Sequence, residues 1–408
     1  MKNACVVGLG YVGLPLGQLF IKKGYSTHGI DTNQSHVEEL RAARLGFETV
    51  SQEYTSLHKA DIIVICVPTP VNTDKTPNLE IINRCLRDVG SHINHGQLII
   101  IESTVYPGYC NDVAVPILEE TSGLKVGQDI YLAHCPERIN PGDTKWNVIN
   151  IPRVIGGFND KSLSIAVTHY ETILDAPVYP MRNMTEAEAV KIVENSFRDI
   201  NIAFVNELAM SFSDIGIDIV QVINGAATKP FGFMPHYPSI GVGGHCIPVD
   251  PYYLIDSAKS RGYDHRFLSL AREINDSMVS FLFNKLELTI QRRHLNRDTL
   301  KICVLGGAYK ANISDTRESP GLRFTEYANE QGVRAKLYDP HVPAISAFKS
   351  LEEALNWCNV AVIATPHDAF KAISLKSFED KGVKVVIDGQ NMLQNEHNQA
   401  VVYIGVGR

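Results

Sequence analysis

The stretch ACVVGLGYVG, residues 4–13, decides the fold of this 408-residue chain. A short apolar run ends at Gly8, and the glycines at 8, 10 and 13 open an amphipathic helical pattern, with Tyr11 and Val12 between them. In such a strand-turn-helix unit the first glycine allows the tight turn, and the second lets the backbone approach a pyrophosphate. The third permits close packing of the helix, whose N-terminus faces the anion.

Asp31 follows at the end of the next apolar run, about twenty residues after this motif. A carboxylate at that point can bind the adenosine ribose hydroxyls and repel a 2'-phosphate, which favours NAD over NADP. Asp31 could instead cap the next helix, but the complete strand-turn-helix context favours a dinucleotide site.

Short apolar runs alternate with helical patterns at both ends of the chain, and each run stops at Gly, Asp or Pro. This alternation predicts parallel sheets covered by helices on both faces. We therefore expect an α/β protein with two Rossmann-like domains joined by a central helical domain. The runs are 4–7, 27–30, 62–67 and 98–101, and then 302–305, 335–338, 360–364 and 383–387.

A helical block separates the two repeats. The sequence from Thr185 to Glu188 has the pattern of a capping box, which predicts a helix start at Thr185, and Gly216 is a plausible stop. A second helical pattern covers 265–292. The expected domains are 1–182 for NAD binding, 183–297 as a helical connector and 298–408 as the second Rossmann-like domain. A connector of this kind is well placed to join subunits, so a homodimer is expected.

Composition excludes several classes of protein. The 38 Lys and Arg against 45 Asp and Glu give a net charge of -7, which argues against a nucleic-acid partner. No secretory signal or membrane-spanning apolar stretch is visible, so a cytoplasmic protein with no membrane partner is expected. The eight cysteines are scattered without metal-ligand spacing, which favours reduced thiols and no metal site.

The segment GVGGHCIPVDP, residues 241–251, places Cys246 in a loop between glycines and prolines, four residues before Asp250. A thiol held in this way could act as a nucleophile. Taken alone, an inert packing cysteine is the better interpretation, but the dinucleotide site raises the odds of a catalytic one. On the helix after Thr185, Lys191 and Asn195 share a face with Arg198 and could stabilise an oxyanion.

Further candidates stand where strands of the predicted sheets end or in loops nearby. Glu137 could be a general base, although composition favours a solvated loop charge. Two cations after the first strand of the second domain could hold phosphates. Besides Glu137, the candidates are Pro68, Thr69, Thr104, Arg138, Lys310 and Arg317.

These motifs, in this order, resemble the UDP-glucose/GDP-mannose dehydrogenase family over essentially the whole chain. The resemblance implies an N-terminal NAD domain, a central dimerisation domain and a C-terminal UDP-sugar domain. The implied reaction is a four-electron oxidation of the sugar C6 hydroxymethyl to a carboxylate with two NAD+ and one water. The matching motifs are GLGYVG at 8–13, VPTP at 67–70, EST at 102–104, PER at 136–138, GGHCIPVDP at 243–251 and RESP at 317–320.

The resemblance also assigns roles. Cys246 matches the nucleophile that forms a thiohemiacetal and then a thioester, Asp250 a carboxylate that assists proton transfer, and Glu137 a residue linked to thioester hydrolysis. Lys191 and Asn195 match oxyanion-stabilising residues that also contact substrate. Among the remaining candidates, Thr104 matches a residue that positions water near the cofactor, Arg317 one that reaches the cofactor, and Arg138, Gly243 and Lys310 match substrate-binding positions.

Around Cys246 the sequence looks like the N-acetylhexosamine branch, so UDP-N-acetylglucosamine is the expected substrate, with UDP-N-acetylmannosamine and UDP-glucose as alternatives. Two departures from the family are a shortened stretch over 40–59 and Gln390 where many members have arginine. A non-redox nucleotide-sugar epimerase and a non-catalytic UDP-sugar or NAD sensor remain as competing hypotheses.

Overall fold

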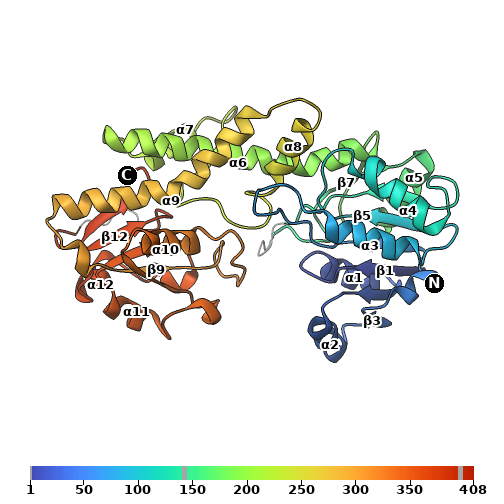
Figure 1. Ribbon diagram of the computed structural model, residues 1–408, viewed down its shortest axis with the longest axis horizontal. Helices are drawn as coiled ribbons and strands as arrows, with labels where there is room; N and C mark the ends of the chain where they lie inside the picture. Colours follow the sequence, from blue (N-terminus) through green and yellow to red (C-terminus); the bar gives the residue numbers. More distant parts are fainter. Residues whose placement is uncertain (1, 140–144, 394–397) are drawn as a thin grey trace. The chain divides into compact units, whose positions relative to one another are not determined.

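The computed structural model describes residues 2–139, 145–393 and 398–408 (Figure 1). The chain divides into two compact units, which are Met1–Glu194 with Tyr252–Asp264, and Asn195–Pro251 with His265–Arg408. Each unit contains one sheet that is mostly or wholly parallel, so the expected α/β architecture with two Rossmann-like domains and a helical region is confirmed. The expected boundaries of three domains stay a prediction.

The first unit has an eight-stranded sheet in the order β3-β2-β1-β4-β5-β6-β7-β8. The first six strands follow the order of a dinucleotide-binding fold, with a topological switch point between β1 and β4. The strands are β1 (Asn3–Val7), β2 (Ser26–Ile30), β3 (Thr49–Ser51), β4 (Ile62–Ile65), β5 (Leu98–Ile101), β6 (Tyr131–His134), β7 (Arg153–Gly157) and β8 (Val178–Pro180). The helices are α1 (Gly13–Lys22), α2 (Gln34–Ala43), α3 (Glu80–Gly90), α4 (Val115–Ser122) and α5 (Asp160–Ile173).

Alternate residues of the central strands enter two separate cores, because side chains of a strand point to opposite faces. Val6, Val64 and Ile100 pack with α1 and α5, whereas Val7 and Ile65 pack with α3 and α4. One pair of strands in this otherwise parallel sheet is antiparallel, namely β6 and β7. The shortened stretch over 40–59 still supplies the three-residue strand β3 at the sheet edge.

The second unit has a five-stranded parallel sheet in the order β10-β9-β11-β12-β13, with the switch point between β9 and β11. Helices cover both faces of this sheet. The strands are β9 (Lys301–Leu305), β10 (Arg334–Tyr338), β11 (Val360–Ile363), β12 (Val385–Asp388) and β13 (Val402–Gly405). The helices are α10 (Pro320–Glu330), α11 (Leu351–Trp357) and α12 (Leu375–Asp380).

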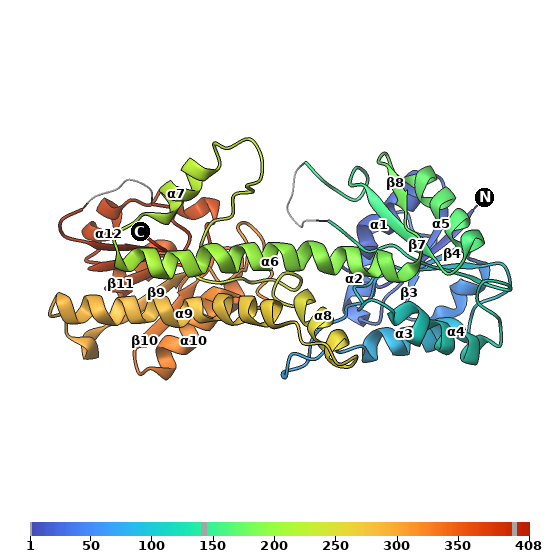
Figure 2. The same ribbon diagram turned by 90° about the horizontal axis from the view of Figure 1, so that it is seen from above.

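Four further helices lie between the two sheets in sequence: α6 (Met184–Asp214), α7 (Ile219–Ala226), α8 (Asp250–Lys259) and α9 (Arg266–Arg292). The C-terminal half of α6 runs beside α9 in the same direction (Figure 2). Buried Arg272 on α9 donates to Asp199 on α6 at 2.6 Å, and Lys285 pairs with Asp214 at 2.9 Å. These polar contacts fix the register of the two helices.

The predicted capping box at Thr185 was wrong. α6 begins at Met184, and the side chain of Asn183 accepts a hydrogen bond from the Glu186 N–H at 2.9 Å. Glu188 does not reach back to the helix start, because its buried carboxylate accepts from the N–H groups of Gly108 and Cys110.

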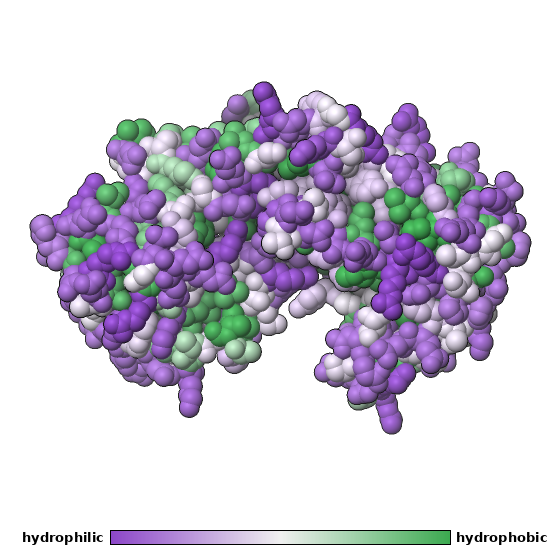
Figure 3. All heavy atoms as spheres, viewed as in Figure 1, coloured by the Kyte–Doolittle hydropathy of each residue, from purple (hydrophilic) through white to green (hydrophobic). Residues whose placement is uncertain are grey.

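None of the eight cysteines forms a disulfide, and six of them are buried. Among the described residues no group of His, Cys, Asp and Glu could hold a metal ion. None of the described helices is long and apolar enough to cross a membrane. Hydrophilic side chains dominate the face drawn in Figure 3, with hydrophobic ones scattered among them.

Candidate active site

The glycine turn after β1 has the geometry that the sequence predicts. Gly8 has a φ of 90°, and its N–H donates to the carbonyl oxygen of Ile30 at 2.8 Å. A Cβ atom at Gly13 would lie 1.8 Å from the carbonyl oxygen of Gly8, so only glycine lets α1 start this close to the turn. At Gly10 a Cβ atom would meet nothing within 4 Å. Packing among the residues that the structure describes does not require glycine there, which fits the close approach of an external pyrophosphate.

Asp31 stands at the carboxyl end of β2, half-buried beside this turn. Its Oδ2 accepts from the Leu9 N–H at 2.9 Å, and its Oδ1 accepts from the Asn33 N–H at 2.9 Å. Each carboxylate oxygen can accept a second hydrogen bond. The residues therefore fit a dinucleotide whose ribose hydroxyls meet Asp31 and whose pyrophosphate meets the turn.

The candidates after β4 and β5 are held at the same carboxyl edge. The hydroxyl of Ser103 donates to the Val67 carbonyl oxygen at 2.7 Å, which ties the two strand ends together beside half-buried Thr104. Buried Tyr253 donates its hydroxyl to the Thr69 carbonyl oxygen at 2.7 Å, which fixes the turn that contains Pro68. Ligands of open α/β sheets bind at this edge.

The interpretation of Glu137 as a solvated loop charge was wrong. Its side chain is only 6% exposed, and its Oε1 accepts from the N–H groups of Arg138 and Ile139. Its Oε2 lies 2.7 Å from Arg153, while buried Lys191 donates to its carbonyl oxygen at 2.6 Å. Glu137 and Lys191 are thus adjacent.

The side chain of Arg138 is half-buried and is bound by other residues of the first unit. Its guanidinium binds both carboxylate oxygens of Glu194 and the carbonyl oxygen of Pro152. The planar fork of arginine suits such a two-point contact with a carboxylate. Arg138 therefore connects the loop after β6 to α6.

A cluster of buried charged groups lies beneath Glu137 and was missed by the sequence reasoning. Arg153 is fully buried, and besides Glu137 it pairs with the carboxylate of Glu102 at 3.5 Å. Tyr170 donates its hydroxyl to Glu102. Burial raises the pKa of Glu102 to about 7, against the lowering effect of Arg153. A charged residue at the start of the otherwise apolar strand β7 is the signal that could have revealed this cluster.

The predicted nucleophile lies in the second unit, in a turn that leads into α8. The carbonyl oxygen of Cys246 accepts from the N–H groups of Val249 at 3.0 Å and Asp250 at 2.8 Å. Asp250 begins α8 and so ends the predicted loop, and it is only 2% exposed. The Asn195 amide donates to its carboxylate at 2.5 Å, so the structure brings Asn195, Asp250 and the Cys246 turn together.

The long loop after β9 packs against the glycines that precede Cys246. A Cβ atom at Gly243 would lie 2.8 Å from the side chains of Tyr309 and Pro320, so this glycine serves close packing. The Gly244 N–H donates to the carbonyl oxygen of Arg317 at 3.0 Å. The Arg317 guanidinium is half-exposed and binds Asp315, and this bond raises the pKa of Arg317.

The candidate residues thus form two sets, one in each compact unit. One set contains the glycine turn, Asp31, Thr104 and the pair of Glu137 and Lys191. The other contains Cys246 with Asn195 and Asp250, and the loop with Lys310 and Arg317. Lys191, Asn195 and Arg198 share one face of the continuous helix α6, but Arg198 is exposed whereas Lys191 is buried.

This combination defines a class of protein: a nucleotide-dependent oxidoreductase with two Rossmann-like domains and a cysteine-containing turn. Sequence models of the UDP-glucose/GDP-mannose dehydrogenase family match its NAD binding domain at residues 2–51 and 42–174, its central domain at 185–277 and its UDP binding domain at 303–395. The chain belongs to this family and is an NAD-dependent oxidoreductase of the UDP-sugar dehydrogenase type.

Similar proteins span the whole chain. The UDP-N-acetyl-D-mannosamine dehydrogenase of Pyrococcus horikoshii is 34% identical, with 99% of this chain and 98% of the relative covered. The UDP-N-acetyl-D-glucosamine 6-dehydrogenase of Pseudomonas aeruginosa is 35% identical, with 91% and 89% covered. A solved structure of UDP-D-ManNAc dehydrogenase from Pyrococcus horikoshii superposes with a TM-score of 0.93 at 33% identity and covers 100% of this chain and 99% of its own.

Proposed function

We propose that this enzyme oxidises the C6 hydroxymethyl group of a UDP-N-acetylhexosamine to a carboxylate. The arrangement of Cys246, Asp250 and Asn195 carries the proposal, because it supplies a thiol in the turn that leads directly into a positioned carboxylate. NAD+, when bound at the glycine turn, supplies the hydride acceptor. Two hydrides leave the same carbon in this reaction, so two NAD+ are consumed for each sugar.

Residues of this chain have distinct parts in the proposed reaction. The thiolate of Cys246 adds to the aldehyde carbon made by the first oxidation, and the resulting thiohemiacetal loses the second hydride to become a thioester. Water then cleaves the C–S bond, which releases the carboxylate and the thiol. Cys246 precedes the N-terminus of α8, whose dipole favours negative charge, and the carboxylate of Asp250 can move the protons.

Roles taken from the family resemblance, for residues of both units, complete the proposal. Lys191 and Asn195 stabilise the negative oxygen that develops when sulfur adds to the carbon. Glu137 serves thioester hydrolysis, and Thr104 positions the water. The buried guanidinium of Arg153, 2.7 Å from the carboxylate of Glu137, holds that carboxylate in place.

The identity of the sugar rests on the sequence around Cys246 and on the relatives. The expectation of UDP-N-acetylglucosamine stays a prediction, and UDP-N-acetylmannosamine stands beside it because a relative of that activity covers 99% of the chain. NADH absorbance with a panel of UDP-GlcNAc, UDP-ManNAc, UDP-GalNAc and UDP-glucose distinguishes them by initial rate.

Two measurements test the chemistry. Fewer than two NADH formed per sugar consumed would contradict the four-electron reaction. Replacement Cys246→Ala should abolish sustained uronate formation, whereas the control Cys358→Ser should retain it, because the thiol of Cys358 is buried in an apolar core of the second unit and donates to the Leu355 carbonyl oxygen at 3.8 Å. Undiminished turnover by the Cys246 variant would remove this residue from the mechanism.

We also infer that the enzyme is a homodimer formed through its helical region. Phe197 and Phe204 are 48% and 54% exposed on α6. They lie seven residues apart and therefore share one helix face. Exposed aromatic residues on one face are typical of interfaces. Light scattering should give twice the chain mass for the wild type and a smaller mass for the double variant Phe197→Ser, Phe204→Ser; a monomeric wild type contradicts the inference.

A further inference from the structure

The second Rossmann-like domain repeats the glycine turn of the first with a longer loop. Gly306 follows β9 with a φ of 102°, as Gly8 follows β1 with a φ of 90°. A Cβ atom at Gly321 would lie 2.1 Å from the Gly306 carbonyl oxygen, just as a Cβ atom at Gly13 would lie 1.8 Å from the Gly8 carbonyl oxygen. Gly321 therefore corresponds to Gly13. Five positions separate the first pair of glycines and fifteen the second, so the second loop has ten extra residues.

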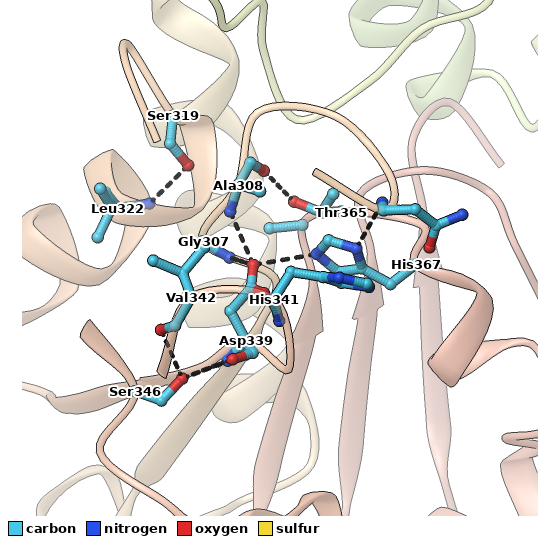
Figure 4. Close-up of polar contacts among 12 residues, drawn as sticks. Gly307, Ala308, Ser319, Leu322, Asp339, His341, Val342, Ser346, Thr365 and His367 are labelled. Carbon is cyan, nitrogen blue, oxygen red and sulfur yellow. Dashed lines mark hydrogen bonds and ion pairs between the residues drawn. The ribbon is translucent and has the colours of Figure 1, made fainter. Parts of the chain in front are cut away.

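In this domain, the carboxylate at the position that could bind a ribose is already hydrogen-bonded by groups of the protein itself. Asp339 ends β10 as Asp31 ends β2, but it is only 1% exposed (Figure 4). Its Oδ2 accepts from the N–H groups of Gly307 at 2.7 Å and Ala308 at 2.8 Å, and its Oδ1 accepts from the His341 N–H at 2.7 Å. Burial would raise the pKa of Asp339, but these bonds and one from His367 lower it.

The consequence is a different mode of phosphate binding. The N–H groups at the start of this glycine turn point at Asp339, so they are directed away from an external pyrophosphate. Phosphate binding in this domain must depend more on the side chains of the inserted loop, which contains Lys310 and Arg317. The conformation of that loop then determines the positions of these two charged side chains.

His367 connects the middle of the inserted loop to the sheet through hydrogen bonds. It follows β11 at the switch point and is fully buried (Figure 4). Its Nδ1 lies 2.9 Å from the N–H of Asn312, and its Nε2 lies 3.0 Å from Asp339. A backbone N–H can only donate, so Nδ1 accepts and carries no proton. The neutral ring then donates from Nε2 to Asp339, and both ring nitrogens are used.

Further bonds support the same point of the loop. The side-chain amide of Asn312 donates to the carboxylate of Asp368 at 2.8 Å, and the Asp368 N–H donates back to the Asn312 side chain at 3.0 Å. Asn312 has a φ of 60°, a conformation that asparagine tolerates better than most residues. The Tyr309 N–H donates to the Asp315 carbonyl oxygen at 2.9 Å and closes the loop around Lys310.

We propose that His367 is a positioning residue for the phosphorylated substrate. Through Asn312 it sets the conformation of the loop over 307–319, and so it sets the position of Lys310, which meets the UDP moiety. This inference rests on the proposed function. His367 does not touch the substrate; it acts through the loop.

A pair of substitutions separates the two bonds of the ring. The amide nitrogen of His367→Gln can reach the place of Nε2 and donate to Asp339, but no atom replaces Nδ1. The amide oxygen of His367→Asn can replace Nδ1 and accept from Asn312, but the bond to Asp339 is lost. His294→Gln is the matched control, because His294 is exposed and follows α9, outside the inserted loop.

We expect His367→Gln to raise the KM for the UDP-sugar and the Kd for UDP about tenfold, with kcat changed less than about twofold. Amide exchange of the peptide over 308–319 should also become about tenfold faster in the absence of substrate. His367→Asn should change KM and loop exchange far less, and its cost should appear as a lower Tm. The control should behave as the wild type.

Several outcomes overturn the inference. Unchanged loop exchange in His367→Gln shows that the ring does not fasten the loop. Faster exchange with unchanged KM and unchanged Kd for UDP shows that the loop does not position the substrate. A wild type that binds UDP without oxidising any UDP-sugar contradicts the proposed function alone, because the UDP titration still tests His367. A wild type that binds no UDP overturns both.

Discussion

The buried cluster of Glu102, Arg153 and Glu137 makes one prediction that can be worked through in detail. Glu102 is fully buried and its pKa is raised to about 7 from an ordinary value of 4.5, mainly by burial. A carboxyl whose pKa is higher in the folded state contributes stability below its unfolded pKa. That contribution is lost as the pH rises toward 7. The substitution Glu102→Gln keeps the shape of the neutral form and removes this dependence.

The magnitude follows from the shift. One pKa unit corresponds to about 1.4 kcal/mol, so between about pH 5 and about pH 8 the wild type loses roughly 2.5 kcal/mol that the variant keeps. For a unit of roughly 200 residues, this equals a change of about 5–10 °C in Tm. The variant should therefore gain about that much thermal stability relative to the wild type across this pH range.

Thermal unfolding of both proteins followed by circular dichroism at the two pH values measures this difference. Glu120→Gln is the control, since Glu120 is exposed on α4 and its substitution should leave the pH dependence of Tm unchanged. A Tm difference between Glu102→Gln and wild type that is the same at both pH values would refute the reasoning. So would a variant that loses stability as the pH rises.

Further predictions concern the glycine turn, its carboxylate and the helical region. Gly13→Ala should lower the free energy of unfolding by about 1–3 kcal/mol, because its Cβ atom would lie 1.8 Å from a backbone oxygen. Gly10→Ala should leave stability within about 0.5 kcal/mol, yet weaken NAD binding in calorimetry; equal stability losses would contradict this. Asp31→Ala should raise the KM for NAD about 10–100-fold and reduce the preference for NAD over NADP. An unchanged ratio of the KM values for NAD and NADP argues against a ribose-binding role of Asp31. Arg272→Met leaves the carboxylate of Asp199 buried without its cation, so urea unfolding should show a loss of about 3–5 kcal/mol; a loss under about 1 kcal/mol counts against the ion pair.

Much of the fold could be predicted from the sequence, because its central strands are short apolar runs bounded by Gly, Asp or Pro. Five strands were not predicted, because they are short and several contain poor strand signals such as the glycines of β7 and the proline of β8. They are β3, β6, β7, β8 and β13. The start of α6 was misplaced by one residue, because the tertiary contact of Glu188 with Gly108 and Cys110 competes with a capping box.

The candidate site, like the fold, could be predicted only in part from the sequence. Residues near each other in sequence, such as Gly8 and Gly13 or Cys246 and Asp250, were predicted from spacing alone. The bond between Asn195 and Asp250 joins positions 55 residues apart, and only the resemblance brought them into one site. The inward direction of Glu137 depends on Arg153, and the fixed loop depends on His367; neither follows from local pattern, because both need a partner from another strand.

The cysteines have a practical consequence for following this enzyme in solution. Burial raises the pKa of the thiols of Cys5 and Cys85 to about 12, and raises those of Cys110 and Cys135 well above the ordinary value. A thiolate-selective reagent should therefore react slowly with these positions while the chain is folded, and faster at half-exposed Cys246. The number of alkylated cysteines, counted by mass, then reports how much of the first unit has opened.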